Sequence, residues 1–263
     1  MRVKTATITT NCEISGPPHA PVVMLSHSLG SNLLMWGPQL AVLEGHFRVL
    51  RYDTRGHGGS DIPGDAYRLE ELVADAAALL DALAIPTVHF VGLSMGGMIA
   101  QGFALSHPDR LDRLVLCDTS AFMPAEAQPI IQDRIDTARR EGLAALVDST
   151  LMRWFTTDYL RRRGPGVDMI QSILQSSPAA GYIGCTEAIR RLNYLDDLSR
   201  IERPTLIVVG EDDPGTPVAA ARAIHERISG SRLVILPSAS HLCNIEQPQA
   251  FNSTLTGFLG SGA

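Results

Sequence analysis

The sequence contains almost no lysine and no closely spaced cysteines. Lys4 is the only lysine among 263 residues, which disfavours Schiff-base and serine–lysine chemistry, because both need a lysine at the reacting centre. No G-x-x-x-x-G-K-[ST] phosphate loop occurs either. The four cysteines, Cys12, Cys117, Cys185 and Cys243, form no C-x-x-C pair and have no metal-finger spacing. We therefore expect free thiols in a cytoplasmic protein without a metal ion or another cofactor.

The sequence also lacks a basic excess and long apolar runs. The formal net charge is -6 and the pI is near 5.7, which argues against a nucleic-acid or anionic-membrane partner, because both require a basic surface. The only basic run, Arg161 to Arg163, is typical of a solvated helix end. No stretch approaches 18 uninterrupted apolar residues, and the N-terminus has no apolar signal region. We expect a protein that neither enters a membrane nor is secreted.

Short apolar runs rich in β-branched residues recur along the chain, with helical patterns between them. This alternation predicts an α/β fold with a mostly parallel central sheet flanked by helices. The runs are nearly continuous in hydrophobicity, which is typical of strands buried on both faces. The candidate strands are "PVVMLSH" (21–27), "FRVLRYD" (47–53), "VHFVG" (88–92), "RLVLCD" (113–118), "TLIVVG" (205–210) and "RLVILP" (232–237).

One long segment interrupts this alternation. Between Asp118 and Thr205 no convincing strand occurs, and pieces such as "IIQDRIDTARREGLAALVDSTLMRWF" alternate apolar and charged residues at helical spacing. We interpret residues 121–200 as a helical cap inserted into a single α/β core formed by residues 1–120 and 201–263. The first twenty residues are expected to form a short antiparallel hairpin at the edge of the sheet.

The segment "VHFVGLSMGG" carries the clearest chemical motif. Gly92, Ser94 and Gly96 match G-x-S-x-G, and the apolar run before and the helical pattern after provide the context that this motif requires. The glycines allow a sharp strand-to-helix turn that exposes the serine hydroxyl. The alternative is a serine without a chemical role in a strand-to-helix turn that the glycines make flexible. We predict that Ser94 is a nucleophile, because suitable partners follow later in the chain.

A serine nucleophile needs a histidine base. Three of the eight histidines, His27, His57 and His241, follow the carboxyl ends of predicted strands, where ligands gather in open α/β sheets. In the nucleophile-elbow arrangement the chain order is serine, acid, histidine. Only His241, in "PSASHLCNIEQP", comes late enough, so we predict that it is the base.

The acid that orients the histidine is expected in "GEDDPGTP", the loop after the predicted strand 205–210. We choose Asp213 because it lies deeper in this loop, with Asp212 as a helper or a solvent-facing neighbour. Asp118, at the end of the preceding predicted strand, is the alternative.

The tetrahedral oxyanion of acyl transfer needs preorganised N–H donors. We predict the backbone amide of Met95, which opens the helix after the nucleophile, and that of Leu29 in "HSLG". The glycine-rich loop "YDTRGHGGSD" (52–61) lacks G-x-G-x-x-G, and we interpret it as a structural turn pinned by Asp53 and Arg55.

Several motifs together resemble the α/β-hydrolase fold superfamily and, more narrowly, the 3-oxoadipate enol-lactonases, also called β-ketoadipate enol-lactone hydrolases. They are "SHSLGSNLLMW", "RYDTRGHGGSD", "GLSMGGMIAQ", "GEDDPGTPV" and "ASHLCNIEQPQAF", and the resemblance runs from about His27 to Phe251. It implies a carboxylic ester hydrolase that opens a small enol-lactone in bacterial catabolism of aromatic compounds, by the protocatechuate or the catechol branch. Capped esterases, C–C hydrolases and cofactor-free haloperoxidases share most of these motifs.

The lactone implied by the resemblance carries a free carboxylate, which in an acidic protein needs a local cation. Arginine suits this task because its guanidinium grips both carboxylate oxygens. The candidates in the cap are Arg134, Arg153 and Arg190, with Trp154 as an apolar wall. For each of them taken alone, a solvated residue or an ion-pair partner is the alternative.

Two other functions fit the same motifs. The first is a carboxylesterase, lactonase or perhydrolase of broader specificity, which would use the same triad. The second is a non-catalytic ligand receptor, which the intact set of Ser94, Asp213 and His241 disfavours. A homo-oligomer is compatible with the sequence.

Overall fold

A single eight-stranded sheet runs through the molecule, of which the computed structural model describes residues 1–260. The strand order is β1-β2-β4-β3-β5-β6-β7-β8. The two outer pairs, β1 with β2 and β2 with β4, are antiparallel, and all later pairs are parallel. The strands are β1 (Arg2–Lys4), β2 (Thr9–Ser15), β3 (Val22–Ser26), β4 (Arg48–Tyr52), β5 (Val88–Leu93), β6 (Leu111–Cys117), β7 (Thr205–Gly210) and β8 (Arg232–Leu236).

The predicted α/β fold is therefore confirmed, including the N-terminal hairpin and the six candidate strands. Each of the six differs from its predicted bounds by at most two residues at either end. Every residue of β5 and β7 is buried, as expected for central parallel strands that are covered on both faces.

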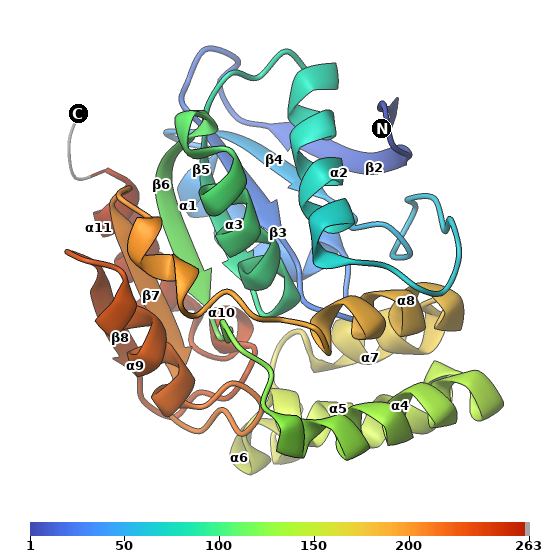
Figure 1. The fold of residues 1–263 in the computed structure, drawn as a ribbon. Helices are drawn as coiled ribbons and strands as arrows, with labels where there is room; N and C mark the ends of the chain where they lie inside the picture. Colours follow the sequence, from blue (N-terminus) through green and yellow to red (C-terminus); the bar gives the residue numbers. More distant parts are fainter. Residues whose placement is uncertain (261–263) are drawn as a thin grey trace.

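Helices cover both faces of the sheet (Figure 1). Side chains that alternate along β3 point to opposite faces: Met24 packs in one apolar cluster, and Val23 and Leu25 in the other. The first cluster includes side chains of α2 (Leu69–Ala82), α3 (Met95–Ser106) and α9 (Val218–Arg227). The second includes side chains of α1 (Gly37–Leu43), α10 (Cys243–Glu246) and α11 (Pro248–Leu259). Short 3-10 helices η1 (Leu33–Trp36) and η2 (Pro108–Arg110) lie in the connections.

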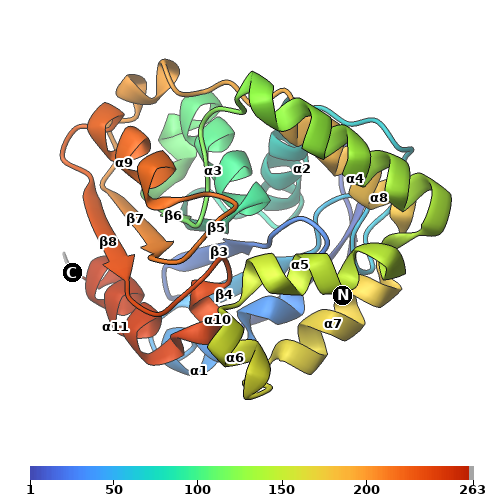
Figure 2. The ribbon, with the colours of Figure 1, turned by 90° about the horizontal axis from the view of Figure 1, so that it is seen from below.

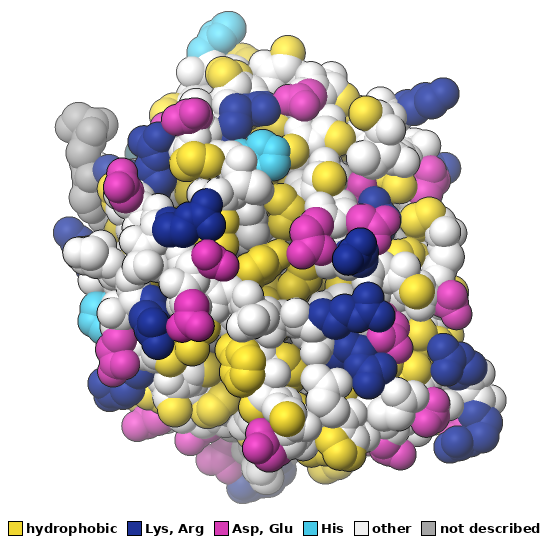
Figure 3. All heavy atoms as spheres, in the orientation of Figure 1, with side chains coloured by type: hydrophobic (Ala, Val, Ile, Leu, Met, Phe, Trp, Pro, Cys, Tyr) yellow, Lys and Arg dark blue, Asp and Glu magenta, His cyan; other side chains and the backbone are white. Residues whose placement is uncertain are grey.

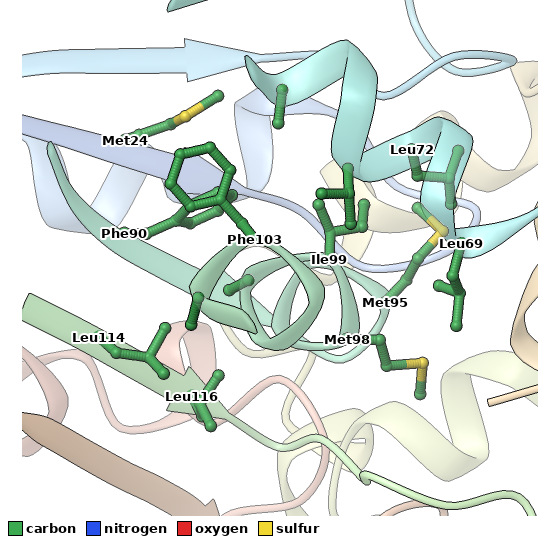
Figure 4. Close-up of a cluster of buried hydrophobic side chains, with 14 of the residues drawn as sticks. Met24, Leu69, Leu72, Phe90, Met95, Met98, Ile99, Phe103, Leu114 and Leu116 are labelled. Atoms are coloured by element: carbon green, nitrogen blue, oxygen red, sulfur yellow. The ribbon is translucent and has the colours of Figure 1, made fainter. Parts of the chain in front are cut away.

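Helix α3 lies at the centre of the first cluster (Figure 4). Its Met95, Ile99 and Phe103 are fully buried. They lie between the side chains of α2 and those of the strands, such as Leu72 and Phe90. This packing fixes the start of α3, where the chain turns from β5.

Most helices of the cap segment, residues 121–200, lie on the side of the sheet where β6 and β7 end (Figures 1 and 2), whereas its last helix packs beside α3 on the way to the start of β7. An isolated bridge between Phe122 and Asn193 joins its two ends. Its helices are η3 (Ala125–Ala127), α4 (Gln128–Glu141), η4 (Leu143–Leu146), α5 (Val147–Trp154), α6 (Thr157–Arg161), α7 (Val167–Ser176), α8 (Ala179–Ile189) and η5 (Asp197–Arg200).

The cap segment packs tightly on the rest of the chain. A Cβ atom on Gly181 of α8 would collide with the backbone of Gly56, in the loop after β4. The buried carboxylate of Glu246 in α10 accepts hydrogen bonds from Thr156, at the start of α6, and from the backbone of Ser240. The cap segment therefore covers the carboxyl ends of the strands and contacts the core at several points.

In Figure 3, acidic and basic side chains are interspersed over the face shown. Within residues 1–260, none of the helices combines the length and the apolar character needed to cross a membrane.

Candidate active site

Ser94 lies at a sharp turn between the last residue of β5 and the first residue of α3. Its backbone has φ 55° and ψ -115°, a region that residues with side chains rarely adopt. The backbone N–H of Ser94 donates to Cys117 O at 2.9 Å. Its carbonyl accepts from Met98 N at 3.1 Å and from Thr119 Oγ1 at 2.7 Å. The surrounding chain thus holds the serine in a strained conformation.

The glycines of the G-x-S-x-G motif are required by close packing. A Cβ atom on Gly92 would collide with Gly96 O, and one on Gly96 would collide with Ser26 O on β3. Because β5, the turn and α3 approach each other this closely, only glycine fits at both positions.

Asp213 and His241 are brought together at the ends of neighbouring strands. Asp213 follows β7 and His241 follows β8, and Asp213 Oδ2 lies 2.8 Å from His241 Nδ1. Asp213 also accepts hydrogen bonds from Gly215 N at 2.7 Å, Thr216 N at 3.1 Å and Thr216 Oγ1 at 2.5 Å. The loop therefore fixes the carboxylate before it orients the imidazole.

The contact between Asp213 and His241 shifts the pKa values of both groups. Burial opposes the charged imidazole of His241, but the carboxylate of Asp213 outweighs it, so the pKa of His241 is raised above its ordinary value. Burial opposes the charged carboxylate of Asp213, but His241 and Thr216 outweigh it and lower its pKa to about 2. Asp213 is thus ionised at neutral pH, and its imidazole partner is a stronger base than a free histidine.

Asp118, the alternative acid, has a different environment. Its side chain is buried, its backbone φ is 41°, and its Oδ1 accepts from Gly210 N at 2.8 Å. Burial and the neighbouring Asp213 raise the pKa of Asp118 to about 8. His241 Nδ1 donates its hydrogen bond to Asp213 Oδ2 and not to Asp118. Asp212 is exposed, and its carbonyl faces Ser240 Oγ at 3.4 Å.

Ser94 and His241 line the same cavity, which lies between the sheet and the cap segment. Its volume is about 300 Å³. Leu29 lines it from the core, and Trp154 closes it beside His241, with the two rings stacked at 6.2 Å between centroids. Apolar side chains of α4 and α8, such as Ile131 and Ile189, form part of the wall.

Two of the three predicted arginines line this cavity. Arg134 on α4 and Arg153 on α5 are half-buried, and no acidic side chain lines the cavity with them. Neither has a carboxylate partner among residues 1–260. Arg153 Nη2 donates to Thr150 Oγ1 at 3.3 Å. Burial and the nearby Arg134 lower the pKa of Arg153, as expected for two cations that face one chamber.

The third arginine is placed elsewhere, which corrects the sequence-based expectation. Arg190, just past α8, forms an ion pair with Glu187 at 3.1 Å and contacts Gln128 and Gln132. It does not line the cavity. Successive residues at a helix end point in different directions, so the position of Arg190 directly after Ile189 was not sufficient to place its side chain.

Of the two residues predicted to stabilise the oxyanion, Met95 follows Ser94 in the chain and Leu29 lines the same cavity as Ser94. Met95 is the first residue of α3, where backbone N–H groups have no acceptor within the helix. Leu29 lies in the loop after β3 and lines the cavity. In the part of the chain that the structure describes, no group accepts a hydrogen bond from its backbone N–H. Both positions therefore suit amides that bind developing negative charge.

Sequence reasoning missed Thr216 and Tyr182. Thr216 donates to Asp213 Oδ2 and lies 3.3 Å from His241 Nδ1. The spacing of an aspartate and a threonine three residues apart in a proline-bounded turn is a signal for such a contact. Tyr182 on α8 lines the cavity, and burial raises its pKa. No local pattern distinguishes it from other tyrosines.

The described side chains form no arrangement typical of a metal site. Over the described range, 1–260, no group of three or more His, Cys, Asp or Glu side chains is arranged to hold an ion. The expectation that no cofactor is used stays a prediction.

Comparisons with known proteins agree with the geometry. Residues 21–160 match the family described as alpha/beta hydrolase fold, and residues 186–263 match the family described as TAP-like protein. The chain belongs to the alpha/beta hydrolase fold family. Its relatives identify it further as a carboxylic ester hydrolase that resembles the 3-oxoadipate enol-lactonases.

Three relatives illustrate this similarity. 3-Oxoadipate enol-lactonase 2 of Acinetobacter baylyi is 38% identical over 245 residues, which cover 93% of this chain and 91% of the relative. The crystal structure of the enol-lactonase from Burkholderia xenovorans LB400 superposes with a TM-score of 0.96 at 39% identity, covering 99% of this chain and 100% of that one. A protein of Shigella flexneri whose name describes a carbamate hydrolase, RutD, is 30% identical over 257 residues, covering 94% of this chain and 95% of its own.

Proposed function

We propose that this enzyme hydrolyses 3-oxoadipate enol-lactone to 3-oxoadipate in the catabolism of aromatic compounds. Ser94 is the nucleophile, His241 the general base and Asp213 the acid that orients it. Leu29 and Met95 supply the amides that bind the oxyanion. The enzyme requires no metal ion or other cofactor for this reaction.

The observation that carries this proposal is the cavity itself. It holds Ser94, His241 and two arginines without carboxylate partners, and its other walls are largely apolar. Half-buried cations without a partner are partly desolvated and uncompensated, so such a pair favours an anionic ligand. A small lactone with one carboxylate fits a chamber of about 300 Å³ that is cationic on the cap side and catalytic on the sheet side.

Each step follows from the placement of these groups. Ser94 Oγ attacks the lactone carbonyl while His241 takes the hydroxyl proton, and the oxyanion is bound by the two amides. The ring C–O bond then breaks, and the enolate leaves. It takes up at carbon the proton that His241 had received and becomes the ketone, which leaves His241 neutral. A water molecule activated by His241 attacks the acyl-enzyme, which releases the acid and regenerates Ser94.

The test compares two substrates. Loss of the enol-lactone's ultraviolet absorbance is followed beside hydrolysis of a neutral nitrophenyl ester. We expect Ser94→Ala to abolish both activities. We expect Arg153→Ala or Arg134→Ala to lower kcat/KM for the lactone by about 10- to 100-fold, because a charged hydrogen bond to the carboxylate is lost. Hydrolysis of the neutral ester should change little in the arginine variants.

Arg190→Ala is the matched control, because this arginine belongs to the same cap segment but does not line the cavity. It should leave both activities near those of the wild type. Equal catalytic efficiency of the wild type on the two substrates would reject the enol-lactone assignment in favour of a broad esterase. A folded protein that hydrolyses neither substrate would support a receptor instead.

A further inference from the structure

Two buried histidines, which do not line the cavity and which the proposed reaction does not use, contact each other. His27 follows β3, and His57 lies in the loop after β4. Both are at most 1% exposed, and their ring centroids are 5.2 Å apart. A neighbouring thiol, Cys185 of α8, packs 3.9 Å from His57 Nδ1. Each imidazole belongs to one loop and hydrogen-bonds to the other.

The hydrogen bonds of the pair are reciprocal. His57 Nε2 accepts from the backbone N–H of Gly30, in the loop after β3, at 2.9 Å. His27 Nε2 accepts from the backbone N–H of Thr54, in the loop after β4, also at 2.9 Å. Each Nδ1 faces a carbonyl oxygen, that of Ser28 for His27 and that of Arg55 for His57.

This pattern fixes the state of both rings. A backbone N–H can donate only to a ring nitrogen that carries no proton, so Nε2 is bare in each imidazole and Nδ1 carries the hydrogen. Both histidines are therefore neutral. Burial and the nearby His27 lower the pKa of His57 to about 3, and burial lowers the pKa of His27. The surroundings thus favour the only state that can accept both amides.

The pair acts on the residues that present the Leu29 amide. The oxyanion loop is defined here as residues 28–30. The backbone N–H groups on either side of Leu29 have protein acceptors: Ser28 N contacts Met35 Sδ at 3.4 Å, and Gly30 N donates to His57. Gly30 has φ +73°. The N–H groups of Leu29 and Gly30 belong to successive planar peptide units that meet at the Leu29 Cα, so only the φ and ψ angles of Leu29 separate their directions. Anchoring one amide therefore aims the next one at the cavity.

We propose that His57 is a positioning residue that, through its Nε2 bond to the Gly30 amide, holds the Leu29 N–H in place to bind the oxyanion. The proposal rests on the proposed serine mechanism and extends it. His57 touches no substrate. It fixes the Leu29 N–H before the reaction begins. This donor stabilises the transition state only when negative charge develops on the carbonyl oxygen.

The experiment uses a nitrophenyl acetate assay of the full-length enzyme. His57→Phe keeps a ring but provides no acceptor for the Gly30 amide. We expect kcat to fall by about 10- to 100-fold with KM nearly unchanged, since loss of a whole oxyanion donor costs about 100- to 1,000-fold. Affinity for a trifluoromethyl ketone, which forms a tetrahedral adduct with the serine, should fall in parallel. His57→Gln can place an oxygen near the Nε2 position and should recover most of the rate.

His89→Phe is the control. His89 is also buried, but it lies at the start of β5 against Phe47, away from the cavity, and we expect wild-type kinetics. If His57→Phe does not fold, His57→Asn replaces it, because the shorter amide does not reach Gly30.

A wild-type kcat in His57→Phe, or in His57→Asn where that variant replaces it, would overturn the proposal. So would a loss that appears only in KM, or one that glutamine does not rescue. Ser94→Ala in the same assay separates the two levels of inference: if it retained activity, the serine mechanism itself would be wrong, whereas an inactive Ser94→Ala beside a fully active His57→Phe rejects only the role of His57.

Discussion

Asp213 receives three hydrogen bonds from its own loop in addition to its contact with His241. The sequence favoured Asp213 for its depth in this loop and left Asp118 as the alternative, because both follow a strand. The structure separates them by surroundings: donors around Asp213 favour the carboxylate, whereas burial around Asp118 favours the protonated acid. Two carboxyl groups at one sheet edge therefore have different charges near neutral pH.

Asp213→Asn should slow the reaction and move its pH profile. The asparagine cannot stabilise a charged imidazole, so we expect kcat to fall by about 10⁴-fold, as for triads of this kind. The pKa of His241 is raised mainly by Asp213, against the effect of burial. In the wild type, kcat/KM on a neutral ester should therefore be lost below a pH that exceeds the ordinary histidine value, because only the neutral imidazole is a base. In the variant, the remaining activity should persist to lower pH. An unchanged acid limb would assign that limb to another group.

Asp118→Asn should alter stability more than chemistry. Because the pKa of Asp118 is about 8 in the folded protein and about 4 when unfolded, the folded state keeps a proton that the unfolded chain releases. The free energy of unfolding should then decrease as pH rises from about 4 to about 8, by up to about 1.4 kcal/mol per pH unit. Asparagine preserves the acceptor for Gly210 N and removes this titration. Urea unfolding at pH 5.5 and 8.5 should show a clearly smaller decrease in the variant, and equal decreases would show that Asp118 is not the titrating group.

At the scale of helices and strands, the sequence was most informative where a pattern is local. The strands were predicted because buried parallel strands are continuous apolar runs, and the turn at Ser94 because only glycine fits around it. The cap was predicted as helical from spacing alone. The sequence could not rank Arg134 and Arg153 above Arg190. A shift of one position along a helix turns a side chain away from the cavity, and Arg190 pairs with Glu187 instead. Contacts between distant backbones, such as that of Gly181 with Gly56, leave no local pattern at all.

Gly181→Ala tests that contact between α8 and the core. A methyl group here meets backbone and not a flexible side chain, so the helix must shift, and we expect the free energy of unfolding to fall by about 1 to 3 kcal/mol. The adjacent Tyr182 lines the cavity, so kcat/KM for the lactone should fall as well. Gly37→Ala is the matched control: Gly37 is the first residue of α1, has helical backbone angles, and has open space around it. Chemical denaturation that shows the same stability for both variants would argue against a close-packed contact.

At the scale of the whole molecule, the cap segment and the core share one apolar cluster. Leu151, Trp154 and Ile170 of the cap belong to the same buried cluster as Leu25 and Leu93 of the sheet. Glu246 adds a polar connection between the two parts. Separation of the cap segment from the core would expose much of this apolar surface to water. We infer that the two parts unfold together.

The two tryptophans provide a direct measurement of this coupling. Trp36 lies in the core against Phe251, and Trp154 lies in the cap against His241. In Trp36→Phe only the cap tryptophan remains, so its fluorescence reports on the cap while far-UV circular dichroism reports on the whole chain. Because both signals come from one variant, any destabilisation caused by the substitution affects them equally. The two denaturation curves should coincide, which is the criterion for a single cooperative transition. If the fluorescence of Trp154 changed at a lower denaturant concentration, the cap would unfold independently, and its contribution to the cavity would then depend on a local equilibrium and not on the stability of the fold.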